Sequence, residues 1–416
     1  MYVKENSEFM LLRFTFKNFK SFCDEAVLDL TASSITEHKD SLIKINNIDI
    51  LPIAAIFGAN GSGKSNLIEA LYSMRNEVIG AIYKDNRKSF IIPYYFDKKS
   101  RNSPTEFELC IYSWELKKEF RYGFSRTVDE VLEEWLFVKT FSKTPTVKEK
   151  CVFYRKKNNK LISELVNKNE LSEIEFVSSV TTNDELIISN IGKRNKCPYG
   201  YIYFWFSKNL GMINFSEISE STGYLNQELL KILNEDEKWL KHVENLIKFI
   251  DPSIEGIKIK KELDAQMNDR YFPYSLHKDD ESTISPVPFS IESCGTKKMF
   301  FLSMHLISSL HFGRPLFIDE LDSKLHPLLL RYIVKMYHDK IDNKSGGQLI
   351  FSSHNLICLD SSDLRRDEIW FIEKNNQKST MFSLYDFKEE TIRKDLDFGK
   401  HYLNGRFGAV PFNDEG

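Results

Sequence analysis

The sequence contains a glycine-rich segment, GANGSGKS at residues 58–65, whose residue types and spacing fit the binding of phosphate groups. In a loop of this pattern, glycines allow backbone N–H groups to surround phosphate oxygens. Lys64 would reach the β and γ phosphates of a nucleotide, and the hydroxyl of Ser65 would bind Mg²⁺. A glycine-rich turn that binds nothing is the alternative, and the flanking strand and helix patterns disfavour it. The expected nucleotide-binding residues are Asn60, Gly61, Gly63, Lys64, Ser65 and Asn66.

A second segment, FIDELDSKLHP at residues 317–327, ends an apolar strand pattern with two acids. We expect Asp319 to be the carboxylate on the Mg²⁺ side and Glu320 to orient or polarise the attacking water. Two acids after a strand are otherwise typical of a solvated strand end or a helix cap. Because the phosphate-loop pattern occurs in the same chain, we favour the functional interpretation, which is nucleotide hydrolysis.

The segment SSHN at residues 352–355 follows the next predicted strand. A single histidine after a strand is more often structural than catalytic. Here His354 would lie on the strand next to the acidic pair, where it could sense the γ phosphate. We therefore include His354 among the expected catalytic residues.

The segment IESCGTKK at residues 291–298 opens a predicted helix. Ser293 offers a hydroxyl and Gly295 an N–H at the helix start, a geometry that binds anions. From the local sequence alone we favour an ordinary N-cap over an anion site.

The elements expected to position these residues alternate between strands and helices. The apolar run at residues 50–57 predicts a strand buried on both faces, and apolar residues at helical spacing follow from Leu67 to Met74. The last part of the chain, from Pro286, predicts more such units, and their alternation favours a largely parallel sheet. They are a helix over 297–310, a strand over 315–319, a helix over 327–338, and strands over 348–353 and 368–373.

Between these regions the pattern changes twice. Short, aromatic-rich strand patterns occupy about residues 90–160, and helical patterns dominate about residues 161–251. The clearest amphipathic helical stretch covers residues 225–250, and residues 277–285 form the best candidate for a loop.

The separation of Lys64 from Asp319 is too long for a compact nucleotide-binding domain and implies an insertion. We expect an N-terminal lobe over residues 10–140, a mainly helical insertion over 141–285 and a C-terminal lobe over 286–416.

Composition supports an ordinary globular protein of about two or three domains, with 416 residues, 42% hydrophobic and 28% charged. The 57 Lys and Arg against 60 Asp and Glu give a net charge of −3, so a nucleic-acid contact would need a local basic patch. Six scattered cysteines disfavour both a disulfide framework and a zinc site. No apolar stretch approaches the ~18 residues of a membrane span, and we expect a cytoplasmic protein without a membrane partner.

In this order, the four segments resemble the ABC-type ATPase heads of structural-maintenance-of-chromosomes (SMC), double-strand-break-repair and RecF-like proteins. GANGSGKS resembles Walker A, ESCGTKK the ABC signature, DELDSKLHP Walker B with a D-loop at Asp322, and SSHN the switch histidine. The ESxGT signature, the LHP after the D-loop and the closing YLNGRFGAVP at residues 402–411 most resemble the small ATPases of the AAA15 and AAA21 type. Those ATPases include subunits of bacterial abortive-infection and other antiphage systems, and relatives of the overcoming-lysogenization-defect nucleases.

The resemblance implies an α/β fold, the ABC-ATPase head of P-loop NTPases, with a mixed sheet core, an antiparallel β-subdomain and a mostly helical insertion. It implies ATP and Mg²⁺ as cofactors and a head-to-tail sandwich of two copies, as a homodimer or a higher homo-oligomer. Ser293 and Gly295 of one copy would cap the γ phosphate held by the other, and Asp322 would belong to the same site. Hydrolysis at Glu320 would reopen the sandwich.

Two positions depart from the pattern of the family. No glutamine precedes Gln227, so Asp97 or an atypical loop must take the place of the usual Q-loop glutamine. Thr296 stands where the signature usually has its second glycine, as is common in the AAA15-like branch.

Two functions of different classes remain open. In the first, the chain is the sensor and scaffold ATPase of an antiphage complex and controls a separate toxic effector, either TOPRIM-like, HNH or another toxin. A fused effector is not expected, because a short segment follows His354. In the second, it is a RecF- or SMC-like repair or maintenance ATPase that clamps DNA. A structural NTP-binding protein with negligible turnover is disfavoured by the presence of both Asp319 and Glu320.

The sequence offers weak support for DNA as a partner. Three basic clusters could contact phosphate backbones, although most charge runs are solvated faces. The clusters are at residues 156–160, 193–196 and 258–261.

Overall fold

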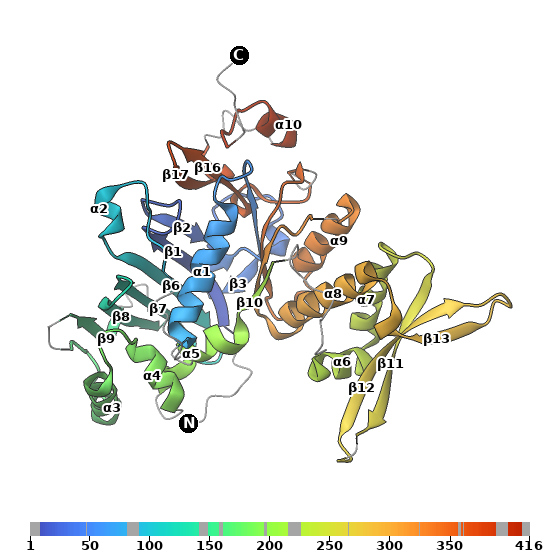
Figure 1. Ribbon diagram of the computed structural model, residues 1–416, viewed down its shortest axis with the longest axis horizontal. Helices are drawn as coiled ribbons and strands as arrows, with labels where there is room; N and C mark the ends of the chain where they lie inside the picture. The colour runs from blue at the N-terminus through green and yellow to red at the C-terminus, as the bar shows by residue number, and fades with distance from the viewer. Residues whose placement is uncertain are drawn as a thin grey trace.

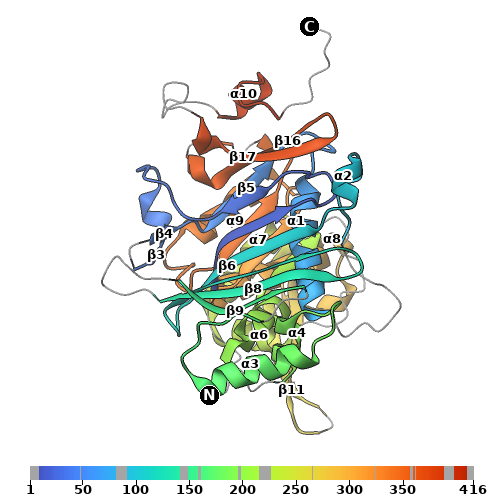
Figure 2. The same cartoon turned by 90° about the vertical axis from the view of Figure 1, so that its left-hand side faces the viewer.

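The computed structural model describes most of the chain, and Figure 1 and Figure 2 show its elements from two directions. In the described part, no helix combines the length and the hydropathy that crossing a membrane requires. The described residues are 9–46, 48–80, 91–140, 149–157, 161–194, 198–214, 226–264, 266–323, 325–356, 359–360, 362–387 and 398–409.

The central sheet combines strands from distant parts of the sequence. Its order is β10 (Gly211–Asn214), β14 (Pro315–Asp319), β15 (Gln348–Ser352), β5 (Ile53–Phe57), β16 (Ile369–Asn375) and β17 (Lys378–Ser383). The first five run parallel, and β17 pairs antiparallel with β16. Every residue of β5, β14 and β15 is buried, as expected of parallel strands covered on both faces. The predicted α/β fold with a mixed sheet core is confirmed.

A second, fully antiparallel sheet forms the β-subdomain. Its order is β2 (Ala26–Asp29), β1 (Phe9–Lys17), β6 (Thr105–Ser113), β7 (Lys118–Arg126), β8 (Val131–Thr140) and β9 (Lys150–Lys156). Strand β9 extends this sheet beyond residue 140, the boundary expected for the N-terminal lobe. The lobe boundaries at residues 140 and 285 remain predictions.

Two hydrophobic cores cover the faces of the central sheet. Ala54 and Ile56 of β5 belong to the core that contains helix α1 (Lys64–Ile79) and the antiparallel sheet. Ile53, Ala55 and Phe57 face the core that contains α8 (Cys294–Phe312) and α9 (Pro327–His338). Figure 1 accordingly shows α1 beside the antiparallel sheet, with α8 and α9 on the other side.

The predicted single strand over residues 50–57 is wrong. Ile50 instead ends β4 (Ile48–Ile50), which pairs with β3 (Ile43–Ile45), and β5 begins only at Ile53. Pro52 between them cannot donate a ladder hydrogen bond, which favours a break at this point. The apolar run therefore joins the buried end of β4 to the fully buried β5, and the two strands belong to different sheets.

Short helices that follow β9 pack on the first core. They are α3 (Lys168–Val180), α4 (Ile187–Arg194) and α5 (Tyr201–Phe204), followed by a π-helical turn at Trp205–Asn209. Trp205 and Phe206 of that turn are fully buried. Glu134 of β8 fastens α4 to the antiparallel sheet, because its carboxylate accepts the N–H groups of Ile187 and Ile188 at 2.7 and 3.0 Å.

The amphipathic stretch expected over residues 225–250 is two helices rather than one. They are α6 (Gln227–Glu235) and α7 (Glu237–Lys248). Asp236 separates them in an extended conformation, and its carboxylate caps α7 by accepting the N–H of Lys238 at 3.0 Å. The continuous helical periodicity hides this break, because both helices bury their apolar faces against α8 and the strands that follow α7.

A three-stranded antiparallel sheet follows α7, and we call it the arm. It comprises β11 (Ile254–Leu263), β12 (Asp269–Lys278) and β13 (Ile284–Pro288), and it projects from the rest of the molecule in Figure 1. The loop expected over residues 277–285 is present but shorter, because β12 ends at Lys278 and β13 begins at Ile284. Residues 279–283 form a tight turn in which Asp279 accepts the N–H groups of Glu281 and Thr283. The residues on either side of this turn belong to the ends of the two strands.

Candidate nucleotide-binding site

The glycine-rich segment connects β5 to α1 in a conformation that requires glycine. Gly58 has a φ of 154° and Gly63, which caps α1, a φ of 117°. A side chain at Gly58 would collide with the carbonyl oxygen of Ile372, and one at Gly63 would lie 2.6 Å from Ser379 Oγ. Strand, loop and helix therefore have the arrangement that cradles phosphate at a helix N-terminus.

Lys64 is the first residue of α1 and is 5% exposed. Its ammonium donates to the carbonyl oxygens of Gly58 and Ala59 at 2.7 and 3.0 Å, so it folds back over its own loop. Burial lowers the pKa of Lys64 to about 8, and the negative charges of Asp319, Asp322 and Glu320 oppose that shift. A buried ammonium of this kind fits an anionic ligand, because phosphate oxygens would replace the hydration that the site removes.

The two acids follow β14, directly beside the loop. Asp319 is buried and its carboxylate accepts the hydroxyl proton of Ser352, the last residue of β15. The N–H of Glu320 donates to the same Ser352 oxygen at 2.8 Å. Glu320 has a φ of 53°, an uncommon conformation for a residue with a side chain and one that recurs at functional sites.

Asp322 and His354 approach each other from neighbouring strand ends. The N–H of His354 donates to Asp322 Oδ2 at 3.0 Å, and the His354 side chain is exposed. The other Asp322 oxygen, Oδ1, is buried without a hydrogen-bond partner among the described residues. A buried carboxylate oxygen without a donor fits a site that an incoming group completes.

Ser293 and Gly295 lie elsewhere, at the junction of the arm and α8. Ser293 caps α8, its hydroxyl oxygen accepting the N–H of Thr296 at 3.1 Å, so the N-cap interpretation is confirmed. Both Ser293 and Gly295 are exposed. Added to Gly295, a side chain would meet Ile250 at an ordinary 3.5 Å, so packing within this chain does not require glycine there. In the described part of the chain, no hydrogen bond links this turn to Lys64.

A chain of hydroxyl groups that the sequence analysis missed shapes the loop. Asn66 donates to Ser21 Oγ at 2.6 Å, Ser21 Oγ lies 2.7 Å from Ser379 Oγ, and Ser379 donates to the carbonyl oxygen of Ser62. The amide of Asn66 therefore faces Ser21 rather than the centre of the loop. Ser21 lies in the connection between β1 and β2, and nothing in the local sequence of Ser379 indicates its contact with the loop.

The C-terminal segment also reaches the loop. The N–H of Ala59 donates to the carbonyl oxygen of Ala409 at 3.1 Å, and the hydroxyl of Tyr402 donates to the same oxygen at 2.8 Å. The Tyr402 ring stacks on Phe371 of β16, with centroids 5.3 Å apart. The described part of the closing YLNGRFGAVP segment thus packs on the central sheet beside the loop, and residues 410 and 411 lie outside the described residues.

Asp97, one of the two candidates to replace the Q-loop glutamine, caps the short helix α2 (Lys98–Arg101) instead. Its carboxylate accepts the N–H and the hydroxyl of Ser100 at 2.9 and 2.7 Å, and these hydrogen bonds lower the pKa of Asp97. The structure gives it no contact with the glycine-rich loop.

The family model described as "AAA domain, putative AbiEii toxin, Type IV TA system" matches residues 53–360, from the start of β5 to beyond the end of β15. The chain belongs to this family, AAA21. The match confirms the predicted resemblance and contains every predicted site residue from Asn60 to His354. The AAA21 assignment supports a P-loop ATPase domain.

Solved structures that match the AAA21 chain include "Dimeric structure of a post-hydrolysis state of the ATP-binding cassette MJ0796 bound to ADP and Pi". That match has 11% sequence identity and a TM-score of 0.26, and covers 90% of this chain and 100% of the other. No curated protein is similar enough to this sequence to count as a match.

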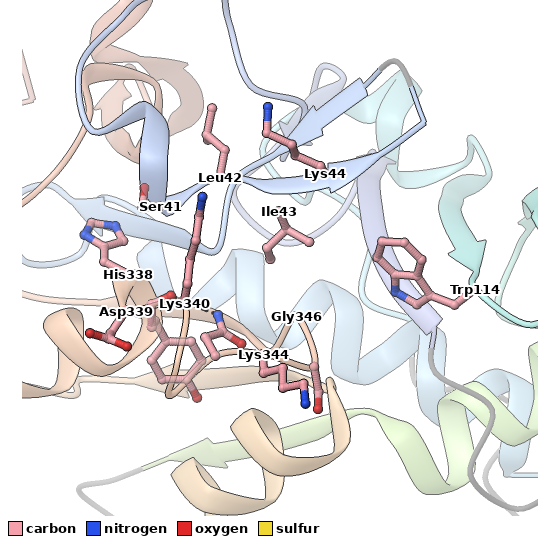
Figure 3. Close-up of a pocket in the computed structure, with 13 residues that line it drawn as sticks. Ser41, Leu42, Ile43, Lys44, Trp114, His338, Asp339, Lys340, Lys344 and Gly346 are labelled. Atoms are coloured by element: carbon pink, nitrogen blue, oxygen red, sulfur yellow. Dashed lines mark hydrogen bonds between the residues drawn. The ribbon is translucent and has the colours of Figure 1, made fainter.

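A cavity of about 590 Å³ lies away from these residues, at the opposite end of the central sheet (Figure 3). It is lined by residues of β3, by Trp114 and by the connection from α9 to β15, which includes Lys340 and Lys344. That connection precedes β15, whereas the glycine-rich loop and Asp319 follow the parallel strands. The cavity therefore contains no predicted site residue of this AAA21 chain.

Proposed function

We propose that this chain binds ATP with Mg²⁺ at residues 58–65 and hydrolyses it. The observation that carries this proposal is the buried ammonium of Lys64 with the carboxylates of Asp319, Glu320 and Asp322 close enough to affect its pKa. A glycine-rich turn with a purely structural role would not require a buried lysine close to three carboxylates. The family match supports the same activity.

Each residue would have a separate task. The N–H groups of the loop and Lys64 would hold the β and γ phosphates. The Ser65 hydroxyl and Asp319 would hold Mg²⁺, which when bound neutralises charge that develops on the phosphate oxygens. Glu320 would hold and polarise the attacking water.

Two copies would be needed to complete each site. Ser293 and Gly295 are exposed at a helix N-terminus that, among the described residues, makes no hydrogen bond to Lys64, and Gly295 is not required by internal packing. A second copy in head-to-tail orientation would bring this turn to the γ phosphate, where a helix N-terminus stabilises negative charge. His354 and the unpartnered oxygen of Asp322 would face the same junction.

The proposed cellular role is the sensor and scaffold ATPase of a bacterial antiphage complex that controls a separate toxic effector. The family description names the AbiEii toxin and a type IV toxin–antitoxin system, which supports a toxic partner. ATP binding would then set the shape that holds or releases the effector. The alternative role, a repair or maintenance ATPase that clamps DNA, is favoured only by basic residues on the arm.

The mass of the Glu320→Gln protein, purified from its native operon with ATP and Mg²⁺, tests these proposals. Removing the carboxylate should trap the ATP-bound form with its effector retained. Light scattering should then give a mass above that of the oligomer alone, so that it is not a whole-number multiple of 48.7 kDa. The double variant Lys64→Ala/Glu320→Gln is the control, because it cannot hold ATP and should stay monomeric.

Two other results would change the proposal. A mass at a simple multiple of 48.7 kDa would support self-association but remove support for a retained effector, and would favour the DNA alternative. A monomer with ATP and Mg²⁺ would contradict the sandwich itself.

A further inference from the structure

One face of the arm carries alternating aromatic and basic side chains. Lys258 of β11 lies directly opposite Tyr274 of β12, and Lys260 lies opposite Phe272. The Lys260 ammonium sits 4.1 Å from the centre of the Tyr274 ring, so these side chains share one face. We call the surface formed by Lys258, Lys260, Phe272 and Tyr274 the outer face of the arm.

The opposite face of the arm is the one that packs on the protein. Ile257 and Ile259 alternate with the two lysines along β11 and are buried in the second core. Tyr271 alternates with Phe272 and is 5% exposed. Phe272, in contrast, is 43% exposed, although burying an aromatic ring of its size would stabilise the fold.

The two lysines of the outer face carry uncompensated charge. The ion pairs described in the arm join Lys261 to Asp269, Arg270 to Asp264 and Lys278 to Glu255, and none includes Lys258 or Lys260. Two acids lie on the same face: Glu262 is further toward the tip, opposite Arg270, and Glu255 pairs with Lys278 at the other end of the strands. In the other two basic clusters, Lys156 and Lys157 pair with Glu133 and Glu130, and the Arg194 guanidinium lies over the Phe176 ring, 4.8 Å from its centre. Residues 158–160, 195 and 196 of these clusters lie outside the described residues.

We propose that the outer face of the arm binds single-stranded nucleic acid. Two aromatic rings two residues apart on one strand are about 6.6 Å apart, which lets successive unpaired bases lie on them. Lys258 lies opposite Tyr274, and the Lys260 ammonium lies over the Tyr274 ring; on binding, Lys260 would move off the ring and both lysines would contact the phosphates. Double-stranded nucleic acid would offer no free base faces to Phe272 and Tyr274.

A protein strand is a less suitable ligand for the arm. The sheet has two edge strands: β11 contacts α6 and α7, and in β13 Pro286 and Pro288 lack the N–H groups that an added strand would need. The lysines would also have to lose their hydration against a protein surface. The proposal goes beyond the ATPase function and does not depend on it, because binding at the outer face requires no ATP.

Fluorescence anisotropy of a labelled oligothymidine of about 16 nucleotides, measured without ATP over a series of salt concentrations, tests the proposal. The variant Phe272→Leu/Tyr274→Leu should bind about tenfold more weakly, because leucine keeps an apolar side chain but removes stacking. The variant Lys258→Gln/Lys260→Gln should reduce the slope of log affinity against log salt by about 1.4. Lys261→Gln, a charge removal on the same strand but the opposite face, is the matched control and should bind as the wild type does.

Three outcomes would overturn the proposal. They are no binding by the wild type at about 50 mM salt, equal weakening by Lys261→Gln and the outer-face variants, and equal affinity for a duplex of the same length. Circular dichroism and ATP hydrolysis of each variant serve as checks of folding, since none of these residues touches the nucleotide site. If the wild type does not bind the oligothymidine, the outer face would be assigned to a protein partner.

Discussion

Ser352 donates its hydroxyl proton to Asp319 Oδ1 across the ends of β15 and β14, and thereby fixes the buried carboxylate that is proposed to hold Mg²⁺. Ser352 Oγ in turn accepts the N–H of Glu320 at 2.8 Å, which sets the start of the left-handed turn at that residue. One side chain therefore positions both acids of the site, although only the histidine two residues later in the same segment was assigned a chemical role.

Ser352→Ala should leave the Asp319 carboxylate and the Glu320 N–H without their shared partner. We expect the free energy of unfolding to fall by about 1–3 kcal/mol and ATP hydrolysis to fall about tenfold or more, because such supporting hydrogen bonds orient metal ligands. Urea unfolding and phosphate release measure the two effects. Ser353→Ala is the matched control, since Ser353 is equally buried but bonds the backbone of Asn355. Equal losses in both variants would argue against a specific role for Ser352.

Lys64 should make the stability of the nucleotide-free protein depend on pH. Its pKa is lowered from 10.5 to about 8, so between these values the unfolded chain binds more protons than the folded one. The free energy of unfolding should therefore rise with pH across this window, by up to about 3 kcal/mol relative to Lys64→Met. Urea unfolding of both proteins at pH 8 and at pH 10.5 measures the difference.

Bound nucleotide should cancel this rise, because phosphate favours the charged form of Lys64 and restores its pKa. Lys99→Met, which removes an exposed lysine of α2, controls for general charge effects. The prediction fails if wild type and Lys64→Met change in parallel between the two pH values.

Glu292 should link the arm to the signature turn. Its carboxylate is held by the Ser275 hydroxyl and lies 2.7 Å from His277 Nε2, both on β12, and Ser293 is the next residue in the chain. Glu292→Ala should misplace the turn and weaken ATP-dependent association of the Glu320→Gln protein by about tenfold, while ATP binding to the monomer is retained. Light scattering at several protein concentrations and a nucleotide-binding assay separate the two properties.

A matched variant is Glu281→Ala, which changes an exposed acid in the turn between β12 and β13. It should associate as the parent does. Unchanged association of Glu292→Ala would show that the arm does not position the signature turn.

Elements bounded by strong local signals were predictable from the sequence. Strand β14 occupies the predicted residues 315–319 and α9 the predicted residues 327–338. Each begins at a proline, and each has an apolar pattern that ends at polar residues. Because Asp319 and Glu320 follow such a strand directly, their place beside the glycine-rich loop could also be inferred.

Features that depend on partners distant in sequence were not predictable. The division of residues 50–57 into β4 and β5 depends on which sheet each half joins, and an apolar run looks the same in both cases. The contacts of Ser379 and Ala409 with the loop arise from the folded arrangement of β16 and β17. The strands of the arm carry enough exposed charge to obscure their alternation, so the sequence predicts a loop over residues 277–285, wider than the turn at residues 279–283.

The position of β5 has a consequence for how the protein is made. This strand leads into the glycine-rich loop, yet its neighbours in the sheet are β15 and β16, which begin at residues 348 and 369. During translation, β5 is synthesised long before β15 and β16. The five buried residues of β5 therefore lack their neighbouring strands until those strands are made. The nascent chain therefore completes the proposed nucleotide pocket only after β16 has been synthesised, and until then a fully apolar strand needs protection from aggregation.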